Sequence, residues 1–230
     1  MSDAPLARFK DLCLDAADPD LLGPWWAEVL GLSWQPWESG GGGAVVGPTP
    51  GHTIWVVAVP EPKSVKHRVH LDIYTQNVAD LEALGATRLE QPDEGRHWTV
   101  LGDPDGGEFC AMVRAELPAD RLHGVVVDSV DPVAIATWWA ETFGAALDTK
   151  GPHWATLEQV PGMPILTMDF NRVPEPKTVK NRIHWDVFAP DVEALVARGA
   201  VVLRRPDEDV DWTVLADPEG NEFCAFAPRD

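Results

Sequence analysis

The sequence predicts an α+β fold built from paired βαβββ modules, with two modules in each of two tandem copies. The first observation behind this prediction is an internal repeat: residues 59–112 align with residues 173–226 at a constant offset of 114, and 30 of these 54 positions are identical. The second is that a strand-like segment precedes an Asp-Pro helix start in both copies, at Asp18-Pro19 and at Asp131-Pro132. We therefore divide the chain into residues 1–115, a linker over 116–120, and residues 121–230.

Within the first copy, each element has its own local signal. A strand is predicted over Phe9–Asp15, and Asp18 and Gly31 have the residue types that begin and end a helix. Further strands follow over Thr53–Val59 and His67–Tyr74, and then a short helix over Val78–Leu84. The sequence Asp103-Pro104-Asp105-Gly106 suits a type I turn and predicts a hairpin between strands at 98–101 and 108–113. The run Gly40–Gly43 has no counterpart in the second copy and predicts a loop.

Composition excludes several functional classes. The chain carries 18 Lys+Arg against 37 Asp+Glu, a formal net charge of -19, which argues against binding to nucleic acid or to a membrane surface through basic groups. The three cysteines, Cys13, Cys110 and Cys224, are far apart and form no CxxC pair, so neither a disulfide framework nor a structural zinc site is expected. No apolar segment is long enough to span a membrane, and Met1–Pro5 lack signal-peptide features. We therefore expect a cytoplasmic protein.

The order of elements and two repeated motifs resemble the vicinal oxygen chelate superfamily, which includes glyoxalase I, bleomycin-resistance proteins and extradiol dioxygenases. The motifs are His-x-Asp on the fifth strand (His70 and His184) and Asp-Pro-(Asp/Glu)-Gly before the last strand, with Asp217–Cys224 reading Asp-Pro-Glu-Gly-Asn-Glu-Phe-Cys. The resemblance covers both copies. It implies two glyoxalase-like half-barrel domains in tandem, each with a concave face that binds a ligand.

The resemblance also implies positions for a divalent metal on the first, fifth and last strands. Counting along each copy gives Asp11, His70 and Cys110 in the first, and Gly124 (or His123), His184 and Cys224 in the second. A buried Mg²⁺ or Mn²⁺ prefers oxygen ligands, and only zinc or iron would accept Cys with His. We therefore predict no metal or other cofactor, with zinc or iron as the ions that these side chains would accept.

Strand alternation places the predicted ligand-binding side chains on one face of the fifth strand and its neighbours. In the first copy these are Lys66, Arg68, Asp72, Trp98, Glu108 and Cys110, and in the second Lys180, Arg182, Asp186, Trp212, Glu222 and Cys224. His70 and His184 are the candidate general bases, because a histidine between Arg and Asp is easily tuned near neutral pH. The alternative is that the histidines are core residues and that Arg68 forms a cross-strand ion pair with Asp72 or Glu108 that fixes the register.

Two residue types are unevenly distributed. Four of the six lysines fall in the two Pro-Glu-Pro-Lys-x-Val-Lys loops, which indicates either an anion site or ion pairs with the abundant carboxylates. At least one tryptophan of each helical pair, Trp25-Trp26 and Trp138-Trp139, is predicted to lie in the core. The tryptophans without an identical partner in the other copy are where a difference in ligand preference would show: Trp34, Trp37, Trp55 and Trp154.

The leading interpretation is a protein that binds a small aromatic or anionic organic ligand in concave pockets without the family's usual metal triad. The partner is then a small molecule, and the chain a monomer or homodimer. The alternative is a metal-dependent lyase, isomerase or dioxygenase of the same superfamily, so enzymatic activity is left open. A third hypothesis is a duplicated scaffold whose concave faces bind a protein.

Overall fold

The computed structural model of the chain describes residues 4–90, 97–149 and 151–228, and it contains the predicted α+β modules. The first copy consists of β1 (Arg8–Ala16), α1 (Pro19–Leu30), β2 (Ser33–Pro36), β3 (Gly42–Val46), β4 (Ile54–Ala58), β5 (Val69–Thr75), α2 (Val78–Ala83), β6 (Thr87–Arg88), β7 (Thr99–Gly102) and β8 (Glu108–Val113), with a 3₁₀ turn over Pro50–His52. The second copy consists of β9 (Leu122–Ser129), α3 (Pro132–Phe143), β10 (Ala146–Thr149), β11 (Trp154–Glu158), β12 (Thr167–Arg172), β13 (Ile183–Phe188), α4 (Val192–Ala197), β14 (Val201–Arg204), β15 (Thr213–Ala216) and β16 (Glu222–Phe226).

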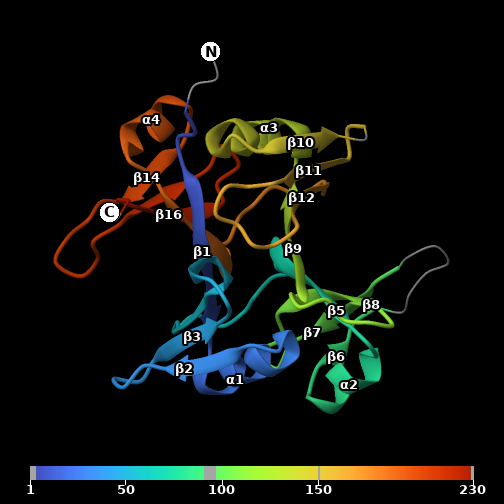
Figure 1. Cartoon of the computed structure of the whole chain (residues 1–230). Helices are drawn as coiled ribbons and strands as arrows, with labels where there is room; N and C mark the ends of the chain where they lie inside the picture. The colour runs from blue at the N-terminus through green and yellow to red at the C-terminus, as the bar shows by residue number, and fades with distance from the viewer. Residues whose placement is uncertain (1–3, 91–96, 150, 229–230) are drawn as a thin grey trace.

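The strands form two eight-stranded sheets, and each sheet takes one module from each copy. The first sheet has the order β14-β15-β16-β13-β1-β4-β3-β2, and the second has the order β10-β11-β12-β9-β5-β8-β7-β6. The copies therefore meet at two antiparallel strand pairs, β1 with β13 and β9 with β5. In Figure 1 the blue β1 runs toward the red strands at the end of the chain, and β9 runs toward the green β5 and β8.

The apolar core packs mainly within each copy, under the first helix. Trp25 and Trp26 of α1 lie edge-on to Phe109 of β8, with ring centroids 5.6 and 5.3 Å apart. In the second copy Trp139 of α3 packs in the same way against Phe223 at 5.0 Å. The sequence predicts at least one buried tryptophan in each helical pair, and in the structure all four are buried, because burying an aromatic side chain removes a large apolar area from water.

The predicted helix ends are confirmed. The Asp18 carboxylate accepts hydrogen bonds from the backbone N–H groups of Asp20 and Leu21, and Gly31 ends α1 with φ of 70°. Asp131 and Gly144 do the same for α3. The predicted hairpin turn is also present, and the Asp103 carboxylate accepts from the Gly107 N–H at 2.7 Å.

The prediction of a loop over Gly40–Gly43 is wrong for its second half, because Gly42 and Gly43 belong to β3. These glycines leave room for tryptophan rings. A Cβ on Gly43 would lie 2.6 Å from the Trp34 ring, and one on Gly42 would lie 2.8 Å from the Trp37 ring. Gly42 and Gly43 are therefore strand positions where a side chain would collide with a tryptophan ring, so small residues are required there.

Among the described residues, no helix combines the length and the apolar character needed to cross a membrane.

Candidate functional site

Each sheet carries one large pocket, and both pockets are built from the two copies together. Pocket A, of about 790 Å³, is lined by Lys10, Cys13, Asp15, Trp37, Trp55, Val57, Lys180, His184, Asp186, Phe188, Arg204, Asp211, Trp212, Val214, Glu222, Cys224 and Phe226. Pocket B, of about 610 Å³, is lined by Lys66, His70, Asp72, Glu90, Trp98, Val100, Glu108, Phe109, Cys110, His123, Val126, Asp128, Asp148, Trp154, Thr156, Glu158, Thr167, Asp169 and Asn171.

The predicted metal-ligand sets are therefore wrong in their grouping. The sequence placed Asp11 with His70 and Cys110, but β1 pairs with β13, so Asp11 lies opposite Asp186 and on the same sheet as His184 and Cys224. Likewise His123 lies in pocket B with His70 and Cys110, not with His184. The physical reason is that the first modules exchange partners between copies, which no local sequence signal records.

In pocket A, an ammonium group lies between two buried carboxylates. Lys10 donates to Asp11 Oδ2 at 2.7 Å and to Asp186 Oδ2 at 3.3 Å, and the Trp55 indole N–H donates to Asp11 at 3.0 Å. The β1–β13 register shifts between Phe9 and Asp11, and such a bulge turns the extra side chain onto a new face. The bulge therefore brings Lys10 into the pocket.

The neighbouring histidine and cysteine of pocket A are held in uncharged forms. Cys224 Sγ lies 3.5 Å from His184 Nε2. Burial lowers the pKa of His184 to about 4 and raises the pKa of the Cys224 thiol. Asp186 Oδ1 lies 3.7 Å from the same Nε2 atom, and His184 Nδ1 has no hydrogen-bond partner. A Cys-His-Asp nucleophile needs the carboxylate on the other ring nitrogen, so this arrangement does not activate the thiol.

Pocket B has the same frame with different groups. Cys110 Sγ lies 3.6 Å from His70 Nε2, and burial lowers the pKa of His70 to about 4. Burial, and then the charge of Asp169, raise the pKa of Asp72 to about 7. At the bulge, His123 accepts or donates a hydrogen bond with the Tyr74 hydroxyl at 2.8 Å through Nδ1. Pocket B thus places a histidine where pocket A has Lys10.

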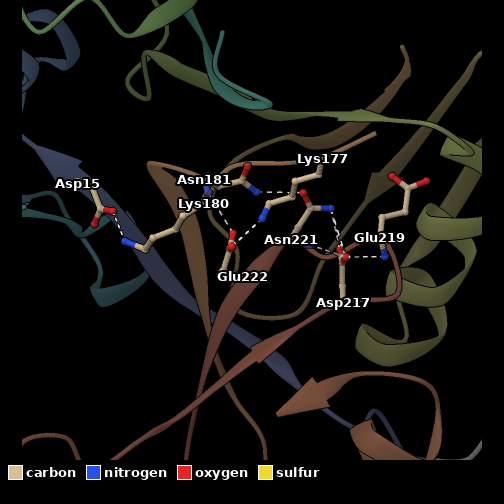
Figure 2. A network of polar contacts seen from close by, with 8 residues as sticks. All are labelled: Asp15, Lys177, Lys180, Asn181, Asp217, Glu219, Asn221 and Glu222. Carbon is tan, nitrogen blue, oxygen red and sulfur yellow. Dashed lines mark hydrogen bonds and ion pairs between the residues drawn. The ribbon is translucent and has the colours of Figure 1, made fainter. Parts of the chain in front are cut away.

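The four loop lysines all form ion pairs, as one of the two interpretations of their clustering expects. Lys63 donates to Glu108 at 2.8 Å and Lys177 to Glu222 at 2.6 Å. The other two lysines join the copies, as Lys66 pairs with Asp128 at 2.6 Å and Lys180 pairs with Asp15. Figure 2 shows Lys180 reaching Asp15, with Lys177 and Asn181 beside Glu222.

Arg68 and Arg182 do not line pockets A and B, contrary to the prediction. They line a third cavity, of about 640 Å³, between the two lysine-rich loops. Each guanidinium crosses to the other copy: Arg68 donates to the Glu175 carbonyl at 2.7 Å, and Arg182 donates to the Glu61 carbonyl at 2.8 Å. Neither arginine pairs with the Asp or Glu groups proposed from strand alternation; Arg182 pairs with Asp105 instead. These arginines hold the copies together.

The structure places the other predicted site residues on pocket walls, divided by sheet. Pocket B contains Lys66, His70, Asp72, Trp98, Glu108 and Cys110. Pocket A contains Lys180, His184, Asp186, Trp212, Glu222 and Cys224.

Sequence reasoning missed Lys10, Asp169, Phe188 and Phe226 as pocket residues. Lys10 was detectable only as the neighbour of Asp11. Asp169 aligns with the unshared Trp55 at the offset of 114, a signal that can be interpreted only once the two pockets are known to be separate. Mismatches between repeats are therefore the positions where the two pockets differ.

The donor groups do not fit the family's oxygen-preferring divalent ion. In pocket A the Lys10 ammonium already forms an ion pair with the Asp11 carboxylate. A metal ion bound beside it would be repelled by the positive charge of Lys10. In pocket B the corresponding first-strand position is Gly124, which has no donor side chain. In the part of the chain that the structure describes, three groups have donor atoms within 4.8 Å of one another, and each includes a thiol: Cys13, Asp15 and His184; His184, Asp186 and Cys224; and His70, Asp72 and Cys110. Thiolate is a poor ligand for Mg²⁺ or Mn²⁺.

Asp186 gives a prediction for stability against pH. Burial, and then the charge of Asp11, raise its pKa to about 8 while Lys10 opposes the shift. A carboxyl with a raised pKa keeps its proton in the folded state, so its contribution to stability is lost as pH rises through about 8. The buried histidines have lowered pKa values in the folded state but titrate near 6.5 in the unfolded chain, so they add stability as pH rises over the lower part of this range. That contribution is common to both proteins and cancels when Asp186→Asn is compared with the unchanged chain. We expect Asp186→Asn to remove about 1.5 kcal/mol of the stability lost between pH 6.5 and 8. Urea unfolding at both pH values measures this, and an unchanged slope would contradict it.

Comparisons with known proteins agree with the duplicated fold described above. The family model described as a glyoxalase-like domain matches residues 11–112 and 124–226. Glyoxalase I from Zea mays superposes with a TM-score of 0.69 at 14% identity, covering 96% of this chain and 92% of that one. The cppA protein from Streptococcus pneumoniae superposes with a TM-score of 0.50 at 11% identity, covering 96% and 99%. No curated protein matches the sequence significantly. At these identities the structural likeness shows the fold alone.

Proposed function

Because this chain belongs to the family of glyoxalase-like domains, we propose that it binds a small planar aromatic molecule in pocket A. The observation that carries the proposal is the aromatic wall of this pocket. Trp55 and Trp37 lie on one side with ring centroids 6.2 Å apart, and Trp212 stacks on Phe226 at 5.2 Å on another. Such surfaces bind flat apolar rings by stacking and by removing apolar area from water.

The charges of pocket A favour an uncharged aromatic ligand over an anion. Lys10 pairs with Asp11, Lys180 pairs with Asp15, and Arg204 pairs with Asp207 at 2.7 Å. A ligand carboxylate or phosphate would have to displace one of these internal carboxylates. Asp186 lines the pocket and its Oδ1 atom has no hydrogen-bond partner, so the carboxyl group of Asp186 is the polar group available to a hydroxyl or N–H on the ring.

Binding without covalent chemistry is also supported by the neutral His184 and Cys224. A protonated thiol is a weak nucleophile, and a histidine with a pKa of about 4 is a weak base. The residues of pocket A can hold and orient a ligand, and none is poised to form a bond with it.

A second candidate is a metal-dependent enzyme of the superfamily. The observation that favours it is the His184, Asp186 and Cys224 group, whose donor atoms lie within 4.8 Å of one another. Elemental analysis of protein purified without chelator tests this candidate. Stoichiometric zinc or iron, lost in His184→Ala, would favour the enzyme over the binding protein.

Calorimetric titration with 1-naphthol tests the proposal. We expect saturable binding with one site, and at least ten-fold weaker binding in Trp55→Ala and Trp212→Ala, about 1.4 kcal/mol each. These residues come from different copies but share pocket A. The matched control is Trp98→Ala, which removes the counterpart of Trp212 in pocket B and should leave naphthol binding unchanged. Tighter binding of 1-naphthalenesulfonate than of 1-naphthol would show that an anion is preferred and would refute the uncharged ligand.

A further inference from the structure

The two pockets differ most at the point where pocket A holds its internal cation. A strand bulge occurs at the same place in both: the register shifts between Phe9 and Asp11 in the first sheet, and beside Gly124 in the second. The bulge directs Lys10 into pocket A and His123 into pocket B. Because the strands and the bulge are arranged in the same way in both sheets, the two pockets differ in their side chains rather than in their backbone.

In pocket A the Lys10 ammonium occupies a defined place. It lies 2.7 Å from Asp11 and 3.3 Å from Asp186, and 4.2 Å from the centroid of the Phe226 ring. Two carboxylates and an aromatic face are the surroundings in which proteins hold an organic ammonium group. In pocket A the protein's own Lys10 therefore provides the positive charge beside these two carboxylates.

Pocket B keeps two carboxylates at its floor, although one of them comes from a different strand. Gly124 replaces Asp11, and Asp169 on β12 replaces Trp55. A Cβ on Gly124 would lie 3.5 Å from Asp169 Oδ2, so the Asp169 carboxylate is next to the space that the Asp11 side chain fills in pocket A. Asp169 is held there by the Thr156 hydroxyl and by the Thr167 hydroxyl at 2.8 Å.

The second carboxylate of pocket B is Asp72, the counterpart of Asp186. Its buried Oδ1 atom lies 3.5 Å from His70 Nε2, and a hydrogen bond from the Cys110 side chain partly offsets the rise in its pKa. Asp169 is near enough for its charge to raise the pKa of Asp72. Each pocket therefore has two neighbouring carboxylates: Asp11 and Asp186 at pocket A, and Asp169 and Asp72 at pocket B.

No described cation neutralises this pair in pocket B. Burial lowers the pKa of both His70 and His123, so both rings are neutral at pH 7. Lys66, the lysine of the described pocket lining, is paired with Asp128 at 2.6 Å. Asp72 and Asp169 are half-buried, and carboxylates that are partly withdrawn from water without a counter-ion are costly, so a positively charged ligand would reduce that cost.

We propose that pocket B binds a small organic molecule bearing an ammonium group, which sits between Asp72 and Asp169 where Lys10 sits in pocket A. The organic part of the ligand lies against the indole rings of Trp98 and Trp154 on the pocket wall. The chain thus carries two different sites, one for an uncharged aromatic molecule and one for an amine. The second site depends on residues of pocket B alone and stands independently of naphthol binding in pocket A.

An organic ammonium fits this pair better than a metal ion does. The donors close enough to share one ion in pocket B are His70, Asp72 and Cys110, and Asp169 is outside that group. A metal would therefore leave Asp169 unneutralised. An ammonium group has three N–H donors, so it can donate to an oxygen of each carboxylate while its positive charge neutralises the pair.

Calorimetry with benzylamine at pH 7, where it is the benzylammonium ion, tests this proposal on the full chain. We expect one saturable site, and at least ten-fold weaker binding of the neutral analogue benzyl alcohol. Asp169→Asn should weaken benzylammonium at least ten-fold, while Glu141→Gln, which removes the same charge from the surface of α3, should not change its affinity. His123→Lys transplants the residue of pocket A to the same bulge, and should abolish binding while raising the melting temperature.

Three results would overturn the proposal. The first is equal affinity for benzyl alcohol and benzylammonium, and the second is unchanged affinity in Asp169→Asn. The third is absence of benzylammonium binding in a protein that binds zinc through His70, which would assign the pocket to a metal. If His123→Lys does not fold, comparing the benzylammonium affinities of Asp169→Asn and Glu141→Gln still tests the site in pocket B. Naphthol binding tests pocket A and does not bear on this result.

Discussion

Replacing Trp139 with alanine is expected to lower the free energy of unfolding by about 4 kcal/mol, the cost typical of deleting a buried tryptophan. The side chain is fully buried and packs against Phe143, Trp185 and Phe223 with ring centroids about 5 Å away. Its indole N–H also donates to Asp217 Oδ2 at 3.1 Å.

The hydrogen bond adds to the loss of packing. Asp217 is buried, and it holds the last hairpin through the backbone N–H groups of Glu219 and Asn221 at 2.9 Å. Burial raises the pKa of Asp217, so its carboxylate is costly to leave with fewer donors. Trp139→Ala removes one donor and opens a cavity at the same place.

Urea unfolding at constant pH measures this effect, with Trp37→Ala as the control. Trp37 is 38% exposed on the rim of pocket A, so its loss should cost about 1 kcal/mol or less. A loss below about 2 kcal/mol for Trp139→Ala would contradict the packing described for α3.

Most of the fold could be predicted from the sequence because its signals are local. Asp18 and Asp131 start helices through contacts with residues two or three positions away, and Gly31 and Gly144 end them through a positive φ. The duplicated motifs gave the order of elements twice. Such features depend on a few neighbouring residues, and the sequence displays them directly.

The pairing of modules could not be predicted, and with it the composition of the site. Each first module can pair with the second module of its own copy or of the other, and the two copies are so similar that strand patterns do not discriminate between them. The choice depends on contacts between distant segments, such as Arg68 with the Glu175 carbonyl and Lys180 with Asp15. Asp11 was consequently grouped with the wrong histidine.

The side chains at the bulges were also beyond sequence reasoning. Strand alternation assigns Lys10 and Asp11 to opposite faces, but the bulge brings both to pocket A. Asp169 was missed because no family position predicted a carboxylate on that strand. Its alignment with Trp55 is informative only once the two pockets are known to be separate.

Cutting the chain between the copies should leave the protein assembled. A protease site inserted into residues 116–120 separates residues 1–115 from residues 121–230, yet each sheet still contains strands from both fragments. Two strand pairs, two arginine bridges and the Lys66–Asp128 and Lys180–Asp15 ion pairs join them. The competing tendency is that each fragment has its own apolar core under α1 or α3.

Size-exclusion chromatography of the cut protein, followed by naphthol titration of the eluted peak, tests most directly that both pockets are shared between the copies. The expected result is a single peak at the mass of the intact chain that contains both fragments and binds 1-naphthol with unchanged affinity. Two separate folded fragments, one of which alone binds 1-naphthol, would contradict the shared pockets.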